Sequence, residues 1–313
     1  CALCGQCITH CPVAALSGRD DKRPVFSQNG MLNTRRKTTV VQVAPAVRTA
    51  WAEAFRLSRK FASPERLAGA LRLMGFDYVF DTTYAADLTI MEEGSEFLER
   101  LKHKEDYQWP MFTSCCPGWV RFLKSQYPDM VDQLSTAKSP QQMFGATMKT
   151  WYAKKLNMDP SKMVVVGVMP CTAKKFETKR DGEAASGYPD VDISITTREL
   201  ARMIESAGIY FKHLPDEEFD NPFGESTGAA TIFGATGGVM EAALRTAVKL
   251  ITGAEAPSPE FNDVRGMKNI KEAQYEVGGL NVKVAVASGT KNAGYLMDKI
   301  KDGTGDYTFI EIM

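Results

Sequence analysis

The chain has 313 residues, of which 44% are hydrophobic and 24% are charged, a composition typical of a globular protein with apolar material for one or two cores. Lysine plus arginine and aspartate plus glutamate are balanced at 38 each, so the charge indicates neither nucleic acid nor a membrane surface as a partner. Apolar runs stay well short of ~20 residues, and the sequence predicts no membrane-spanning helix.

All seven cysteines lie in short motifs of the metal-binding or strand-end type. A disulfide scaffold would be shorter and denser in cysteine, so this usage predicts reduced thiols in an intracellular or anoxic setting. We expect a cytoplasmic protein, with a periplasmic location left open because the chain begins at Cys1 rather than at a methionine.

Four of the cysteines form the run Cys1-x-x-Cys4-x-x-Cys7-x-x-x-Cys11-Pro12, which has the spacing of bacterial ferredoxins. In two-cluster ferredoxins the fourth cysteine of such a run serves the other cluster. We therefore expect the first three to bind one four-iron cubane, which is one thiolate short here, and the fourth to serve a second. Residues 1–18 are interpreted as the C-terminal part of a ferredoxin-like α+β domain.

Residues 19–37 are polar and rich in turn formers, which predicts a linker or a short hairpin. A β-branched strand follows over Thr38–Val43. Ala44 and Pro45 end it and open a helix that is expected to run to about residue 60.

Ser63 and Pro64 predict the cap and first turn of a helix that ends near Met74. A short strand is predicted over residues 78–80, and a long amphipathic helix over residues 85–104.

That long helix carries Glu93 and Glu96, three residues apart, and Arg100, four residues beyond Glu96. This spacing places the three side chains on one face, with Arg100 as a partner for Glu96. On its own, such a group is most simply interpreted as a solvated helix face.

The segment from Phe112 to Trp119 reads Phe-Thr-Ser-Cys-Cys-Pro-Gly-Trp. It lies between a strand end at residues 109–111 and a helix over residues 120–126, in the type of loop where α/β sheets place their chemistry. Neighbouring cysteines do not readily bond to each other, and their side chains point to different sides. The pair predicts one thiolate for a metal and one free thiol; two buried small hydrophobic residues are the alternative.

A second cysteine follows a strand in the same way, which argues against that alternative. A helix from Ser139 to about Leu156 precedes the β-branched strand 163–168. The strand leads directly into Met-Pro-Cys-x-x-Lys-x-x-Glu, with Cys171 as its cysteine.

The second half of the chain continues the alternation of strands and helices, with strands predicted over 193–195, 282–287 and 308–312 and helices over 197–207, 237–252 and 291–301. The pattern predicts an α/β fold of two lobes with mainly parallel sheets around a central cleft that holds a metal cluster.

Residues 233–238, Phe-Gly-Ala-Thr-Gly-Gly, lack the spacing of a phosphate-binding loop. Two interpretations stay open for these glycines: a close approach of backbone to a bulky inorganic group, or a tight turn that opens a helix.

The motifs Thr-Ser-Cys-Cys-Pro-Gly-Trp and Met-Pro-Cys-x-x-Lys-x-x-Glu closely resemble the first two signatures of the iron-only (FeFe) hydrogenases, and residues 233–238 resemble their glycine-rich stretch. With the N-terminal cysteine run, the resemblance covers nearly the whole chain. It implies that residues 38–313 form a hydrogenase catalytic domain, which interconverts hydrogen with protons and electrons. The 4Fe-4S clusters would relay electrons to ferredoxin or another carrier.

The resemblance implies a cofactor called the H-cluster, a 4Fe-4S cubane joined to a two-iron unit with carbonyl, cyanide and dithiolate ligands. By position, Cys116 and Cys171 match cubane ligands. Lys174 matches the lysine that binds a cyanide, and Glu177 the acid that holds the lysine loop. Further positions match cluster contacts, namely Ala44, Pro45, Gln141, Met169 and Met313.

The resemblance also implies a proton path. Cys115 matches the free thiol of the family, and Glu93, Glu96 and Ser135 match its proton-transfer residues. A thiol titrates close enough to neutral pH to give and to take a proton. Arg100 matches the arginine that is paired with the outer glutamate.

The last residues, from Phe309 to Met313, resemble the opening of the third family motif, whose continuation should bring two more cysteine ligands. Beyond its N-terminal run the chain offers only Cys116 and Cys171 as matches to cubane ligands. We therefore expect a sequence clipped at both ends, or else an incomplete cluster.

Two other functions remain possible on sequence alone. A hydrogen sensor or an iron-sulfur maturation factor on the same fold is disfavoured by Cys115, which such relatives tend to lose. An electron-transfer ferredoxin fused to another α/β enzyme leaves Cys115, Cys116 and Cys171 unexplained. The partners expected for a hydrogenase are hydrogen and protons, a redox carrier and hydrogenase maturation proteins.

Overall fold

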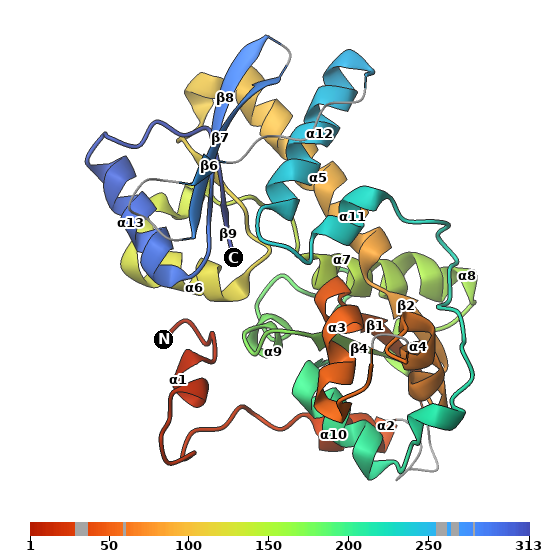
Figure 1. Cartoon of the computed structure of the whole chain (residues 1–313). Coiled ribbons are helices and arrows are strands. Elements are labelled where there is room, and N and C mark those ends of the chain that lie inside the picture. Colours follow the sequence, from red (N-terminus) through yellow and green to blue (C-terminus); the bar gives the residue numbers. More distant parts are fainter. Residues whose placement is uncertain (29–36, 59–60, 255–261, 264–268, 278) are drawn as a thin grey trace. The chain divides into compact units, whose positions relative to one another are not determined.

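Two β-sheets organise the chain, one in each of two units (Figure 1). The computed structural model describes residues 1–28, 37–58, 61–254, 262–263, 269–277 and 279–313. We call residues 3–85 with 140–226 the parallel unit, and residues 1–2, 86–139 and 227–313 the mixed unit.

The sheet of the parallel unit has four strands, and every neighbouring pair is parallel. Its order is β2 (Tyr78–Asp81), β1 (Thr38–Val43), β4 (Met163–Met169) and β5 (Ile193–Thr196). All seven residues of β4 are buried, as expected for a central strand that is covered on both faces.

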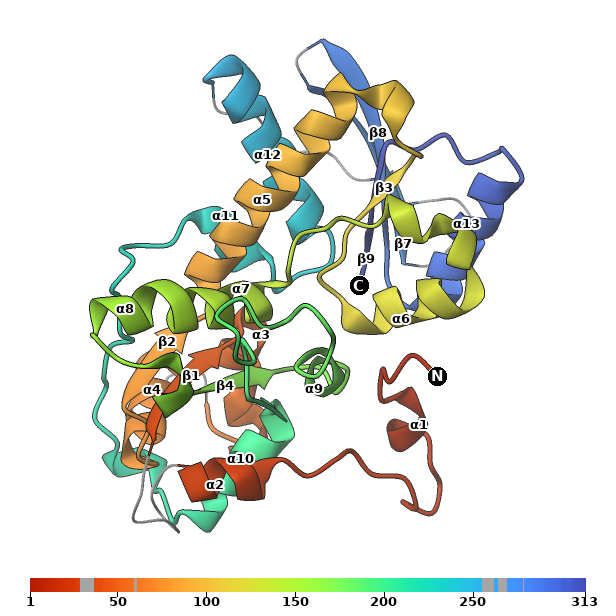
Figure 2. The ribbon, with the colours of Figure 1, turned by 180° about the vertical axis from the view of Figure 1, so that it is seen from behind.

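Helices cover both faces of this sheet (Figures 1 and 2). Because side chains alternate along a strand, Val41 and Val43 pack against one layer and Val40 against the other. The first layer contains α3 (Pro45–Ala50), α4 (Pro64–Leu73) and α10 (Thr197–Ser206). The second is one continuous run of α7 (Pro140–Thr147), the π-helix η4 (Met148–Tyr152) and α8 (Ala153–Lys155).

The sheet of the mixed unit has five strands in the order β3 (Met111–Phe112), β9 (Phe309–Ile312), β8 (Leu280–Ala287), β7 (Ile270–Val277) and β6 (Asn262–Asp263). β3, β9 and β8 are parallel, whereas β7 is antiparallel to β8 and to β6. The sequence predicted β8 and β9, but it did not predict β7, whose residues mix charged and apolar side chains without a long β-branched run.

The mixed unit also buries both faces of its sheet under helices (Figure 2). α5 (Thr83–Lys102, which begins at the boundary of the units) and α12 (Gly238–Thr252) contribute to one core. α6 (Pro117–Gln126) and α13 (Thr290–Lys301) contribute to the other.

Two local predictions need correction. The expected linker contains the helix α2 (Lys22–Gln28), whose Val25 is fully buried; residues 29–36 of that linker lie outside the described residues. The helix expected to reach residue 60 ends at Ala50, followed by the 3-10 helix η1 (Trp51–Phe55). Arg56 has a positive φ of 52°, a left-handed conformation that terminates a helix.

The remaining described elements are short. They are α1 (Gln6–Thr9), η2 (Lys104–Asp106), η3 (Pro128–Gln133), η5 (Pro160–Lys162), α9 (Lys174–Glu177), η6 (Phe211–His213) and α11 (Gly228–Ile232).

Candidate active site

The two adjacent cysteines lie in the loop between β3 and α6, and Cys116 is the residue that precedes the helix. Thr113 anchors this loop: its N–H donates to the Ile310 carbonyl at 3.0 Å, and its hydroxyl accepts from the Ile312 N–H at 3.3 Å. The indole of buried Trp119 donates to the Thr113 carbonyl at 3.1 Å. The loop is therefore held against β9 from its first residue.

The side chains of the pair lie on opposite sides of the loop. Cys115 packs against the α5 and α12 core, and Cys116 packs against the α6 and α13 core. Both are half-buried. The prediction that neighbouring loop cysteines point to different sides is confirmed, and the geometry permits the two sulfurs to have separate roles.

Glu93 of α5 is buried, with 1% of its surface exposed. The pKa of its carboxyl is raised from the ordinary 4.5 to about 8, chiefly by burial and also by the nearby carboxylates of Glu96 and Glu311. A hydrogen bond with the Ser135 side chain and one from the backbone of Ser114 oppose this pKa shift. Among the described residues its Oε2 has no hydrogen-bond partner. Glu93 can therefore hold or release a proton near neutral pH, beside the cysteine loop.

Glu96 continues the polar network one turn along α5. The Ser135 hydroxyl donates to Glu96 Oε2 at 2.8 Å, and the Thr136 N–H donates to the same atom at 2.9 Å. The predicted pairing with Arg100 is confirmed: Nη2 lies 2.6 Å from Glu96 Oε1. The side chain of Glu96 is 17% exposed, so this carboxylate connects the buried Glu93 region to solvent.

Arg100 is almost fully buried, and it does more than pair with Glu96. Its Nη2 donates to the Leu134 carbonyl at 2.8 Å, and its guanidinium lies 5.2 Å from the ring centroid of Tyr107. Arg100 thus binds the segment that carries Ser135 to α5. The interpretation of these charges as a solvated helix face is wrong.

Glu311 is a buried acid that the sequence analysis singled out only as part of a motif. Its two carboxylate oxygens accept from the backbone N–H groups of Gly237 at 2.9 Å and Met240 at 2.6 Å. Burial raises the pKa of this carboxyl to about 7. The available signal was a lone glutamate in the otherwise apolar strand 309–312.

The glycines that precede α12 form a tight turn. Gly237 has a positive φ of 94°, and a Cβ on Gly238 would lie 1.9 Å from the Ile232 carbonyl oxygen. The close approach in this structure is thus between two backbone segments, as in the interpretation of a turn that opens a helix.

In the parallel unit, residues 170–177 follow β4; we call this segment, which carries Lys174 and Glu177, the lysine loop. Lys174 Nζ lies 3.1 Å from Glu177 Oε1, and Glu177 is completely buried. Gln141 of α7 donates from Nε2 to Glu177 Oε2 at 2.9 Å and to the Lys174 carbonyl at 3.3 Å. Three residues predicted from the family motifs are therefore brought together by direct hydrogen bonds.

Other predicted cluster contacts lie at strand ends. Met169 ends β4 and is 3% exposed. Ala44 follows β1, and its N–H donates to the Val168 carbonyl at 3.1 Å; Pro45 opens α3. In the mixed unit, Met313 follows β9, and its carbonyl accepts from the Gly289 N–H at 2.7 Å.

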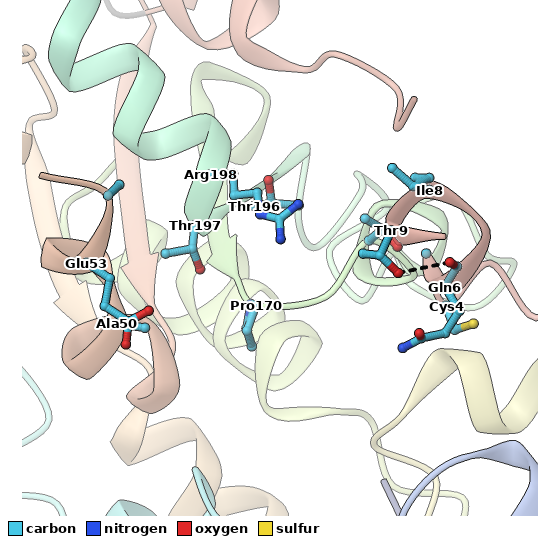
Figure 3. Close-up of a pocket in the computed structure, with 13 residues that line it drawn as sticks. Cys4, Gln6, Ile8, Thr9, Ala50, Glu53, Pro170, Thr196, Thr197 and Arg198 are labelled. Atoms are coloured by element: carbon cyan, nitrogen blue, oxygen red, sulfur yellow. Dashed lines mark hydrogen bonds between the residues drawn. The ribbon is translucent and has the colours of Figure 1, made fainter. Parts of the chain in front are cut away.

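From residue 3 onward, the N-terminal cysteine run lies next to the second cysteine motif within the parallel unit. The Thr172 hydroxyl donates to the Leu3 carbonyl at 3.0 Å, and a Cβ on Gly5 would approach the same hydroxyl to 2.8 Å. Figure 3 shows Cys4 on one side of a cavity of about 560 Å³ and Pro170 with residues 196–198 on the other. The segment around Cys4 therefore packs directly on the residue after Cys171.

The donor chemistry of Cys11 fits iron-sulfur ligation. Backbone N–H groups of Leu16, Val13 and Ala15 lower the pKa of Cys11, which favours the thiolate form that binds iron. Across the part of the chain that the structure describes, no three His, Cys, Asp or Glu side chains gather in a group that could hold a metal ion. The same residues include no helix with the length and apolar character needed to cross a bilayer.

Comparison with known proteins identifies one family. The family described as "Iron only hydrogenase large subunit, C-terminal domain" matches residues 37–313. The NADP-reducing hydrogenase subunit HndD of Solidesulfovibrio fructosivorans is 50% identical over all of this chain and 54% of its own length. The periplasmic [Fe] hydrogenase large subunit of Nitratidesulfovibrio vulgaris is 48% identical over 88% of this chain and 65% of its own. The chain thus spans about half to two thirds of these relatives.

A relative with another name also matches: the nuclear prelamin A recognition factor of Mus musculus is 33% identical over all of this chain and 69% of its own length. Among solved structures, a variant of apo [FeFe]-hydrogenase HydA1 from Chlamydomonas reinhardtii superimposes with a TM-score of 0.83 at 42% identity. The match covers 93% of this chain and 80% of that one. The predicted α/β fold with parallel sheets is confirmed.

Proposed function

Because the chain belongs to the iron-only hydrogenase family, we propose that it forms the catalytic part of an FeFe hydrogenase that interconverts hydrogen with protons and electrons. The observation that supports this most directly is the polar network of Glu93, Ser135 and Glu96 beside the loop that carries Cys115. A protein that only carries electrons has no need of such a network.

In this proposal Cys116 and Cys171 would supply thiolates to the cubane of an H-cluster, and Lys174 would offer its ammonium to a cyanide of the two-iron unit. Ala44, Pro45, Met169, Gln141 and Met313 would line that unit. When bound, the cluster supplies the metal chemistry that splits or forms hydrogen, and the protein residues orient it and move the proton.

The proton moves from the Cys115 thiol to the Glu93 carboxyl, and then by way of the Ser135 hydroxyl to Glu96. Glu93 suits the inner position because its pKa of about 8 lets the carboxyl both take up and release a proton near neutral pH. Glu96 suits the outer position because it is partly exposed and is paired with Arg100.

Cys1, Cys4 and Cys7 would hold one 4Fe-4S cluster and Cys11 would serve a second, and these clusters would supply the electron-transfer chemistry. The contact between Thr172 and Leu3 places the N-terminal segment beside Cys171, which shortens the path to the cubane. Ferredoxin or another redox carrier is the proposed external partner, and maturation proteins would supply the two-iron unit.

The alternative is a hydrogen sensor or a maturation factor that does not turn over hydrogen. The similarity to the nuclear prelamin A recognition factor is in line with this alternative. This alternative is disfavoured because Cys115 and the complete path from Glu93 to Arg100 are present. The cysteine usage of the sequence favours a cytoplasmic location, whereas the relative from Nitratidesulfovibrio vulgaris is named as periplasmic.

The test is hydrogen evolution by the matured protein with a chemically reduced viologen, measured by gas chromatography. The proposal expects continuous hydrogen production that stops when iron is removed. A protein with its full iron content and no hydrogen production above the buffer would instead support the alternative.

A further inference from the structure

A row of three residues crosses the sheet of the parallel unit beneath the lysine loop. Gln42 of β1 is paired in register with Gly167 of β4, and Gly167 is paired with Ser194 of β5. Residues in register on parallel strands face the same side. Gln42 and Ser194 are fully buried.

Gln141 of α7 lies over this row, and hydrogen bonds hold both its backbone carbonyl and its side-chain amide. The Gln42 amide donates from Nε2 to the Gln141 backbone carbonyl at 3.0 Å, and the Ser194 hydroxyl donates to Gln141 Oε1 at 3.0 Å. Thr82 in turn donates to Gln42 Oε1 at 3.1 Å. Both anchors of Gln141 are therefore themselves fixed within the sheet or at its edge.

Gly167 provides the room that this arrangement needs. A Cβ at this position would lie 2.5 Å from Gln141 Oε1 and 3.3 Å from its Cδ. Because Gln141 is 1% exposed and bonded on two sides, its amide has little freedom to move away. The glycine within an otherwise β-branched strand is thus explained by the amide packed above it.

The orientation of the Gln141 amide determines whether its Nε2 or its Oε1 faces Glu177. An ionised carboxylate such as Glu177 only accepts hydrogen bonds, so Nε2 of Gln141 must face it. Oε1 then needs a donor on the other side, and Ser194 supplies it. We propose that Ser194 and Gln42 are positioning residues, which fix Gln141 so that Glu177 directs the Lys174 ammonium. The inference rests on the proposed role of Lys174 in the hydrogenase reaction.

The first test uses protein without iron, so that its result does not depend on hydrogen turnover. The acylation rate of Lys174 by a small amine-reactive ester is followed by mass spectrometry in wild type, Ser194→Ala and Gln42→Met. Release of the loop should raise this rate about fivefold in both variants, the factor expected for one lost hydrogen bond. Ser194→Thr, which keeps the hydroxyl, and Ser206→Ala, which removes an exposed serine hydroxyl on α10, should stay within about twofold of wild type.

The second readout is the infrared cyanide band of the protein loaded with the H-cluster, which should shift in Ser194→Ala and return in Ser194→Thr. If Ser194→Ala does not fold, as judged by circular dichroism, Gln42→Met addresses the same question. Unchanged labelling and an unchanged cyanide band in the folded variants would overturn the inference. Faster labelling in a protein that makes no hydrogen would support the positioning role and refute the proposed function separately.

Discussion

The hydroxyl of Thr172 donates a hydrogen bond to the carbonyl oxygen of Leu3 at 3.0 Å, and Thr172 directly follows Cys171 in the chain. One side chain thereby joins the N-terminal cysteine run to the second cysteine motif. In the proposed function, this contact lies on the electron path.

Thr172→Val keeps the shape of the side chain and removes the hydroxyl. We expect hydrogen evolution with an external electron carrier to fall by up to about fivefold, because the loss of one hydrogen bond lowers the ratio of docked to undocked segment by about this factor. Isotope exchange between deuterium gas and water needs no external electrons and should keep its wild-type rate. Thr150→Val, an exposed threonine on the π-helix, is the matched control. An equal fall in both assays would contradict the assignment.

Ser135→Ala breaks the connection between Glu93 and Glu96. Because the hydroxyl donates to Glu96 and bonds to Glu93, we expect hydrogen evolution to fall on the order of 10²-fold, with unchanged iron content. Ser125→Ala removes an exposed serine hydroxyl from α6 and should have no effect. Hydrogen evolution at the wild-type rate in a folded Ser135→Ala protein would exclude Ser135 from the proton path.

The buried acids should make stability depend on pH. Between the ordinary carboxyl pKa of 4.5 and the raised pKa of about 8, native Glu93 keeps a proton that the unfolded chain has released. The free energy of unfolding should therefore decrease as pH rises through this range. Glu311 should contribute in the same direction over the narrower range between pH 4.5 and its raised pKa of about 7.

Thermal unfolding of wild type and Glu93→Gln measures this effect between pH 5 and pH 8.5. The difference in Tm between the two proteins should shift in favour of Glu93→Gln as pH rises, because the amide has no proton to lose. Glu99→Gln, at an exposed position on the same helix, should parallel wild type. Parallel curves for wild type and Glu93→Gln would contradict the raised pKa of Glu93.

The two adjacent cysteines should differ in iron binding. Cys116→Ser removes a proposed cubane ligand, so we expect the loss of about four iron atoms per chain, as for Cys171→Ser. Cys115→Ser should keep the iron content of wild type because its sulfur lies on the other side of the loop. Iron analysis by mass spectrometry distinguishes these outcomes, and equal iron loss in Cys115→Ser and Cys116→Ser would refute the division of roles.

Local signals in the sequence predicted much of the fold. The strand at residues 163–168 followed from its β-branched run, and the Ser63 cap from the serine before a proline; the Ser63 side chain accepts from the Arg66 N–H. The π-helix within residues 140–155 was not predicted. Its Lys149 is buried and forms an ion pair at 2.7 Å with Asp192, a contact that local sequence does not reveal.

The candidate site likewise combines features that local sequence predicts with features that depend on contacts distant in the chain. Spacing alone placed Glu96 and Arg100 on one helix face, whereas their burial depends on the loop at residues 133–136, which packs on them from elsewhere in the chain. Ser194 and Gly167 belong to no recognisable sequence motif. Their importance follows from the side-chain amide of Gln141, which α7 positions over the sheet.

The central claim is tested most directly by isotope exchange between deuterium gas and water, comparing the iron-loaded wild-type protein with Cys115→Ala. The assay needs the metal centre and the proton path but no electron partner. We expect rapid exchange in wild type and a loss on the order of 10²-fold or more in Cys115→Ala at equal iron content. Absence of exchange in the loaded wild type, or equal rates in the two proteins, would contradict the proposed proton-relaying hydrogenase.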